Sequence, residues 1–268
     1  FDSGTGAVKL EDRDWVTYKT ILSGNIGDED RSDDNTYHVW YNPLDISLDG
    51  SAILDGFIIT AGNADSVAYP DGLCGGGVYN EGSSPTLRNI TFLNNSAGYG
   101  GALWVSAPYL EEATVTLTNV TFQYNSAVGD GGAVYIDAVD AMPGDMGGLT
   151  FTNGIFRGNF AERGGGVFIT DGELDADTPP FRFTNCTISG NAAELGGAFY
   201  VGEGPGEGWM AVTNSILWGN TADEIYLEDG GDLPIVTYSD IQGGFDGVGN
   251  IDLDPRFVEP GSGDLHLQ

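Results

Sequence analysis

Aromatic side chains recur at one position of the chain, the fifth counted from the first glycine of a repeated Gly-Gly pair. Aromatic rings stack on the apolar faces of sugars and on partner proteins. If strand parity holds, these rings face outward as an apolar stripe of roughly 20 Å, at one strand spacing per repeat. Cover by the long inserts, or a parity inverted by a bulge, would bury them instead. The candidate binding residues are Tyr79, Trp104, Tyr135, Phe168 and Tyr200.

A second candidate site is the acidic segment between Asn25 and Asn35. Calcium takes roughly six to eight oxygen ligands, and carboxylates and amides supply them. The segment lacks the glycine and the final glutamate of an EF-hand loop, so a solvated acidic turn is the competing interpretation. The residues predicted to bind calcium, the one cofactor that the sequence suggests, are Asp28, Asp30, Asp33, Asp34 and Asn35.

Catalytic chemistry has little support in the residue pattern. The two histidines, His38 and His266, are remote in sequence, and the few lysines and arginines are scattered. A lyase needs a base beside a charge neutraliser, and no segment supplies both. A glycoside hydrolase needs only two carboxylates, which 40 acidic residues always supply. A polysaccharide lyase or hydrolase therefore remains the least favoured alternative, and we expect a protein without catalytic residues.

The element that must position these side chains is a repeat of about 30 residues. Three copies read Phe-x-x-Asn and two begin with Ile188 or Leu217 instead; all but the last are followed by Gly-Gly-Ala/Gly and an apolar residue. The asparagines are 30, 34, 32 and 29 residues apart. Within a copy, residues 113–118 alternate apolar and threonine side chains with a period of two, which is typical of a strand. No segment has the periodicity of a helical crossover. The sequence therefore predicts an all-β, single-stranded parallel β-helix of about eight coils.

The positions that recur from copy to copy have structural interpretations. We expect an inward ladder of apolar residues and a ladder of asparagines where the chain turns, because asparagine tolerates left-handed backbone and stacked amides bond to one another. The glycine pairs are expected to supply positive φ at the next corner. The apolar ladder comprises Phe92, Phe122, Phe156, Ile188 and Leu217, and the asparagine ladder comprises Asn95, Asn125, Asn159, Asn191 and Asn220.

Charge and cysteine content limit the partners and the compartment. The formal net charge is −31, from 40 acidic residues against nine basic ones, which excludes nucleic acid and anionic membranes as partners. No apolar stretch is long enough to insert into a membrane. Cys74 and Cys186 lie several coils apart in the predicted fold, so we expect free thiols. Acidic surfaces suit a saline or calcium-rich exterior.

The paired motifs resemble the repeats of chlamydial polymorphic outer-membrane proteins and, more broadly, right-handed parallel β-helix proteins of bacterial surfaces. The flanks, with residues 13–15, 20–24, 238–241, 252–257 and 263–268, look like large secreted β-helix proteins of environmental bacteria. The resemblance implies a right-handed β-helix, export, and adhesion or surface structure rather than catalysis. It brings no catalytic residue.

Together these observations predict an extracellular, non-enzymatic structural or surface protein. Because a β-helix has two open ends, we expect it to associate head to tail into a homopolymer. A carbohydrate-binding adhesin that uses the aromatic stripe, with glycans as partners, is the alternative. We expect one elongated body with capping strands and the acidic loop at 1–45, repeats at 46–240, and a final coil and tail at 241–268.

Overall fold

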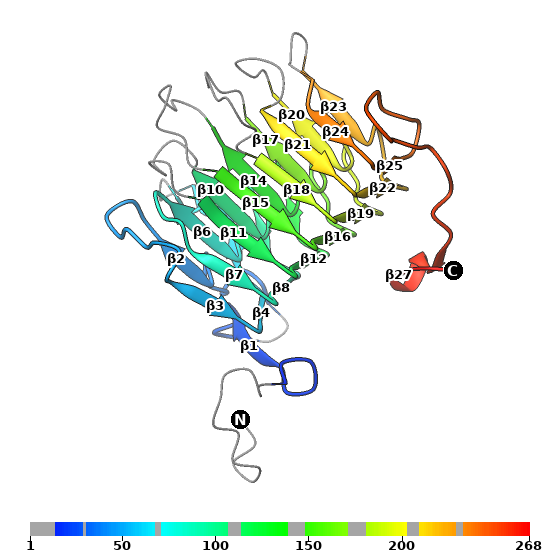
Figure 1. Cartoon of the computed structure of the whole chain (residues 1–268). Coiled ribbons are helices and arrows are strands. Elements are labelled where there is room, and N and C mark those ends of the chain that lie inside the picture. Colours follow the sequence, from blue (N-terminus) through cyan, green and yellow to red (C-terminus); the bar gives the residue numbers. More distant parts are fainter. Residues whose placement is uncertain are drawn as a thin grey trace.

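The computed structural model describes residues 14–28, 31–67, 71–106, 114–138, 148–170, 181–202, 209–228 and 233–268. Its strands stack as successive coils along one axis, with the first strand at one end (Figure 1). Each complete coil passes through three parallel sheets in the same order. The chain is an all-β parallel solenoid, as the sequence predicted. The described residues contain no helix long and apolar enough to cross a membrane.

The first sheet, sheet A, has eight parallel strands. In spatial order they are β1 (Thr20–Ser23), β4 (Phe57–Thr60), β8 (Thr91–Leu93), β12 (Thr121–Gln123), β16 (Ile155–Arg157), β19 (Thr187–Ser189), β22 (Ile216–Trp218) and β25 (Asp240–Ile241). A short sheet D follows the turn after sheet A and contains β5 (Asn63–Ala64), β9 (Ser96–Ala97) and β13 (Ser126–Ala127).

The other two walls, sheets B and C, have seven parallel strands each. Sheet B contains β2 (Trp40–Asn42), β6 (Val78–Glu81), β10 (Leu103–Ser106), β14 (Val134–Asp137), β17 (Val167–Ile169), β20 (Phe199–Val201) and β23 (Ile225–Leu227). Sheet C contains β3 (Ile53–Asp55), β7 (Thr86–Arg88), β11 (Thr114–Thr118), β15 (Gly148–Thr152), β18 (Phe181–Thr184), β21 (Met210–Thr213) and β24 (Ile235–Thr237).

The described solenoid thus has seven complete coils and the first strand of another, where the sequence predicted about eight full coils. The count falls short because the residues after β25 leave the coil path. They form an antiparallel hairpin of β26 (Phe257–Glu259) and β27 (Asp264–Leu267), joined by the 3-10 turn η2 (Pro260–Ser262). This hairpin lies beside the stack rather than at its end (Figure 1).

The core is a set of in-register ladders of apolar side chains. In sheet A the ladder extends the predicted one by a residue at each end, and all its members are at most 1% exposed. The rings of Phe92 and Phe122 stack almost parallel at 4.6 Å between centroids. Each buried side chain of this size contributes roughly 1.5–3 kcal/mol. The ladder comprises Ile59, Phe92, Phe122, Phe156, Ile188, Leu217 and Ile241.

The two glycines of each pair are required for different structural reasons. The first takes positive φ, as expected, for example +69° at Gly131. The second does not; instead, a Cβ at Gly132 would lie 2.4 Å from the carbonyl oxygen of Gly165 in the next coil. The second glycine is therefore required by the close approach of successive coils, which the sequence analysis did not anticipate.

The two ends of the solenoid differ, although the sequence predicted that both are open. At the C-terminal end, residues 242–252 turn across the last coil: the Ile241 amide donates to the Ile251 carbonyl at 3.0 Å, and the Asn250 side chain donates to the Val236 carbonyl at 3.0 Å. Phe245 packs against the core there. At the N-terminal end, an apolar hollow of about 480 Å³ lies between β1, β2 and β3, lined by Leu22, Val39, Trp40, Ala52, Ile53 and Leu54.

Candidate functional site

The predicted aromatic residues form one ladder along sheet B. Consecutive members are paired in register, and most neighbouring rings stack, with centroids 4.6 Å apart for Tyr79 and Trp104 and 4.8 Å apart for Phe168 and Tyr200. The ladder is longer than predicted, since Tyr41 stacks on Tyr79 at 5.2 Å and Tyr226 stacks on Tyr200 at 5.1 Å. The sequence analysis missed these two ends because neither has a glycine pair in front of it.

The ladder is not an open stripe. Tyr79, Trp104, Phe168 and Tyr200 are 3–7% exposed, and Tyr135 is half-buried. The parity is not inverted, because Leu103 and Val105 belong to the core cluster and Trp104 does not. The rings are therefore buried on the outer side of sheet B. The outward parity thus agrees with the sequence prediction, the rings are largely buried, and a binding role for them stays a prediction.

Polar groups fix the rings of this ladder. The guanidinium of Arg163 lies 4.9 Å from the Phe168 ring centroid and 5.0 Å from that of Tyr200, and it forms two 2.8 Å hydrogen bonds with the Asp130 carboxylate. The hydrogen bond to Asp130 raises the pKa of Arg163 above its ordinary value. At the other end, a hydrogen bond to Asp71 raises the pKa of the Tyr41 hydroxyl to about 12. These contacts favour a structural role for the ladder.

The predicted asparagines form a buried chain of amides. In each step, Nδ2 of one asparagine donates to Oδ1 of the asparagine in the next coil, at 3.0 Å from Asn95 to Asn125 and 2.8 Å from Asn159 to Asn191. The same oxygen also accepts the preceding asparagine's backbone amide. The expected left-handed backbone is not at these asparagines but one residue earlier, at positions such as Tyr124 and Gly158.

The amide chain ends on a carboxylate that the sequence analysis did not single out. Asn220 donates its side chain to Glu224 at 2.6 Å and its backbone amide at 3.2 Å. Glu224 is 7% exposed, and burial raises its pKa to about 7 against the hydrogen bonds that lower it. The spacing of four residues after the last repeat asparagine is the only sequence signal for this contact.

A second chain of amides lies on the surface, at the corner between sheets C and A. Its asparagines all have φ between 53 and 56°, and each after Asn89 donates to the one in the preceding coil, for example at 3.1 Å from Asn119 to Asn89. The repeated Thr-Asn before four of the sheet A strands, at 118–119, 152–153, 184–185 and 213–214, was its sequence signal. The members linked by hydrogen bonds are Asn89, Asn119, Asn153 and Asn185.

The predicted calcium ligands are only partly described, since Asp30 lies outside the described residues. Asp33 is ion-paired with Arg31, and Asp34 accepts a 2.9 Å hydrogen bond from the Asp28 amide. Within the described ranges, no group of three or more His, Cys, Asp or Glu side chains is arranged to hold a metal ion. Calcium at this segment stays a prediction. Both cysteines are free, and burial raises the pKa of Cys186 to about 12.

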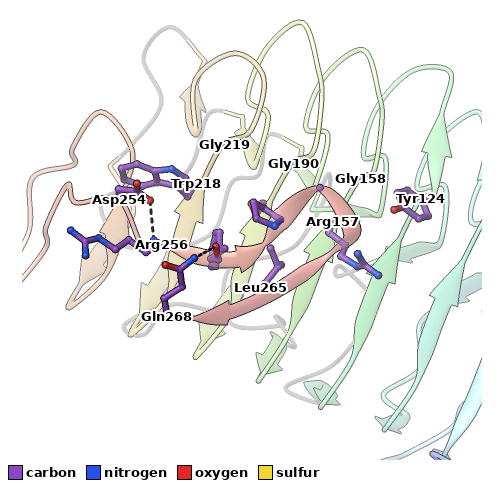
Figure 2. A pocket seen from close by; sticks show the side chains of 14 residues that line it. Tyr124, Arg157, Gly158, Gly190, Trp218, Gly219, Asp254, Arg256, Leu265 and Gln268 are labelled. Carbon is purple, nitrogen blue, oxygen red and sulfur yellow. Dashed lines mark hydrogen bonds between the residues drawn. The ribbon is translucent and has the colours of Figure 1, made fainter.

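A cleft lies elsewhere, between the outer corner of sheet A and the C-terminal hairpin (Figure 2). The cleft has a volume of about 600 Å³. Trp218 lies near Asp254, and Tyr124 and Arg157 lie toward the other side of the hairpin (Figure 2). Further lining residues are Gly158, Ser189, Gly190, Gly219, Arg256, Phe257, Pro260, Gly261, Leu265 and Gln268.

Contacts across the cleft attach the hairpin to the solenoid. The Arg157 guanidinium donates to the Ser262 carbonyl at 3.3 Å and lies 5.7 Å from the Tyr124 ring centroid. Within the hairpin, the Asp254 carboxylate accepts from the Arg256 amide at 2.9 Å, and Gln268 donates to the Phe257 carbonyl at 3.4 Å. The sequence analysis proposed none of these residues as a site, because the contact between Arg157 and Ser262 joins positions 105 residues apart.

The fold and its repeats define a parallel β-helix repeat protein. Two segments of the chain, residues 89–106 and 119–137, match the Chlamydia polymorphic membrane protein repeat. Each match runs from a surface-corner asparagine through sheet A and the glycine pair into sheet B. The chain therefore carries polymorphic-membrane-protein-like β-helix repeats. No curated protein and no solved structure matches the chain.

Proposed function

We propose that this chain is the β-helical body of a bacterial surface protein, displayed outside the cell as a non-catalytic structural element. The observation that carries the proposal is the repeat itself, which is similar to the repeat of a membrane protein family. Its recurrent residues hold successive coils together. Phe122 packs in the core and Asn125 bonds to its neighbours in the adjacent coils. Such ladders along the whole solenoid support a stiff spacer.

The experiment is surface labelling of the source organism. Antibodies raised against the folded chain should label intact cells, and brief protease treatment of intact cells should remove the signal. The parallel labelling of permeabilised cells provides the control. Labelling that appears only after permeabilisation would contradict the proposal.

The ends of the solenoid support a different self-association from the predicted head-to-tail polymer. A filament needs an open edge at both ends, and residues 242–252 occupy the C-terminal one. Among the described residues, β1, β2 and β3 are the edge strands of their sheets at the N-terminal end, and they border an apolar hollow. We therefore propose that any self-association uses the N-terminal end and stops at a dimer.

Electron microscopy and sedimentation over a wide concentration range test this point. We expect short rods as monomers and end-joined pairs. Substituting Leu54→Asp in the hollow should remove the pairs, and Ile251→Asp at the capped end should leave them unchanged. Long fibres in the unmodified protein would restore the head-to-tail polymer.

A further inference from the structure

The cleft beneath the C-terminal hairpin is built from the variable positions of the repeat. In Phe-x-x-Asn, the first and last residues are committed to the core and to the amide ladder, and the two x residues face outward. In the last three coils these pairs are Arg157-Gly158, Ser189-Gly190 and Trp218-Gly219. All six residues line the cleft. The repeat therefore leaves this strip free for recognition, and the hairpin lies over it.

Gly190 and Gly219 keep the floor of the cleft open, whereas a Cβ at Gly158 would meet the Tyr124 ring at 2.5 Å. Gly158, Gly190 and Gly219 have φ of 62, 68 and 74°, and they occupy the position that Tyr124 has one coil earlier. A Cβ at Gly190 would meet no atom within 4 Å. A ligand can therefore approach the backbone closely between the Trp218 ring and the Tyr124 ring. A volume of about 600 Å³ is within the range of small-ligand sites.

The charge at the cleft differs from that of the whole chain. Acidic residues outnumber basic ones 40 to nine overall, yet the cleft is lined by two arginines and one carboxylate. Arg157 is held from two sides, by the Ser262 carbonyl and the Tyr124 ring. A guanidinium has five N–H donors in a planar fork, and the bond to Ser262 uses one of them. The fork suits a carboxylate ligand.

We propose that this cleft binds a short oligosaccharide containing a uronic acid. The sugar carboxylate pairs with Arg157, the apolar face of a sugar ring stacks on Trp218, and Asp254 and Gln268 hydrogen-bond to sugar hydroxyls. Asp254 repels anions, so the acid group lies at the Arg157 side and the neutral ring at the Trp218 side. Arg157 and Trp218 lie toward opposite ends of the cleft in Figure 2, as this orientation of the sugar requires.

The experiment is calorimetric titration of the full chain with a trisaccharide of galacturonic acid, with the neutral galactose trisaccharide in parallel. We expect saturable binding of the acidic sugar and at least tenfold weaker binding of the neutral one. Arg157→Gln and Trp218→Ala should each weaken acidic binding by tenfold or more. Arg157→Lys should recover part of it, because it keeps the charge but loses the fork.

Matched controls are Arg182→Gln, at an exposed arginine of sheet C, and Tyr238→Ala, at an exposed aromatic corner residue outside the cleft. Both should bind like the unmodified chain, and circular dichroism should show that every variant is folded. Equal affinity for both trisaccharides would overturn the acidic class. Absence of saturable binding, or binding unaffected by Arg157→Gln and Trp218→Ala, would overturn the site.

Discussion

The side-chain amide of Asn220 donates a 2.6 Å hydrogen bond to Oε2 of Glu224, so the buried chain of amides ends on a carboxylate at the last coils. Every amide in the chain donates in the same direction along the axis. The last amide of the chain, Asn220, needs an acceptor, and the buried carboxyl group of Glu224 supplies it. Because burial raises the pKa of this carboxyl group, the stability of the last coils depends on pH.

Glu224 gives the first prediction. Its pKa is raised from 4.5 to about 7, so between these pH values the folded chain keeps a proton that the unfolded chain releases. The contribution of this group to the free energy of unfolding is therefore greatest below pH 4.5 and is lost as the pH rises to 7, by on the order of 3 kcal/mol. Glu224→Gln should remove this pH dependence.

Urea unfolding at several pH values measures the effect as a difference between variants, because the other acidic residues also respond to pH. Glu194→Gln, at an exposed glutamate, is the matched control and should keep the pH slope of the unmodified chain. An unchanged slope in Glu224→Gln would show that Glu224 is ionised throughout this range.

The middle of the amide chain gives the second prediction. Asn159 accepts from the backbone and the side chain of Asn125, and it donates to the Phe122 carbonyl and to Asn191. Asn159→Ala leaves these buried groups without partners, at about 1–3 kcal/mol each. We expect the free energy of unfolding to fall by several kcal/mol. Asn153→Gly, in the exposed amide chain and compatible with φ of 56°, should cost less than about 1 kcal/mol. Similar losses of unfolding free energy in the two variants would show that the buried amide chain is no more important for stability than the exposed one.

The aromatic ladder gives the third prediction. Phe168 is 4% exposed and stacks on Tyr135 and Tyr200, with Arg163 against its face. Phe168→Ala should lower the free energy of unfolding by about 3–5 kcal/mol. Tyr41→Ala, at the exposed end of the ladder, should cost far less. Thermal unfolding measures both, and a neutral Phe168→Ala would indicate that the ring faces solvent as a binding platform.

Two glycines give the fourth prediction, which separates backbone strain from lack of space: Gly190 lies just before a ladder asparagine, and Gly132 is the second glycine of a pair. Gly190→Ala meets no neighbour but adopts φ of 68°, so it should cost about 1 kcal/mol. Gly132→Ala has no positive φ, but its Cβ would meet the Gly165 carbonyl at 2.4 Å, so the coils must separate. We expect Gly132→Ala to be the more destabilising of the two, and chemical denaturation of both variants tests the order.

The sequence by itself determined the solenoid and its inward faces. The repeat of Phe-x-x-Asn and paired glycines fixes which residues of each coil stack on the next, because parallel coils in register bring identical positions together. Phe92 and Phe122, or Asn95 and Asn125, could therefore be placed from spacing alone. The glycine pair was recognised as well. Its second residue must be glycine because successive coils approach closely there, and the sequence does not reveal that distance.

Tertiary structure decided what the repeat does not encode. Whether Trp104 is exposed depends on what packs outside sheet B, and local alternation carries no information on that. Closure of the C-terminal end depends on residues 242–252, which follow the last repeat. The cleft joins Arg157 to Ser262 across 105 residues of chain. Contacts between a repeat and a segment without a repeat have no periodic signal in the sequence, so only the folded chain brings them together.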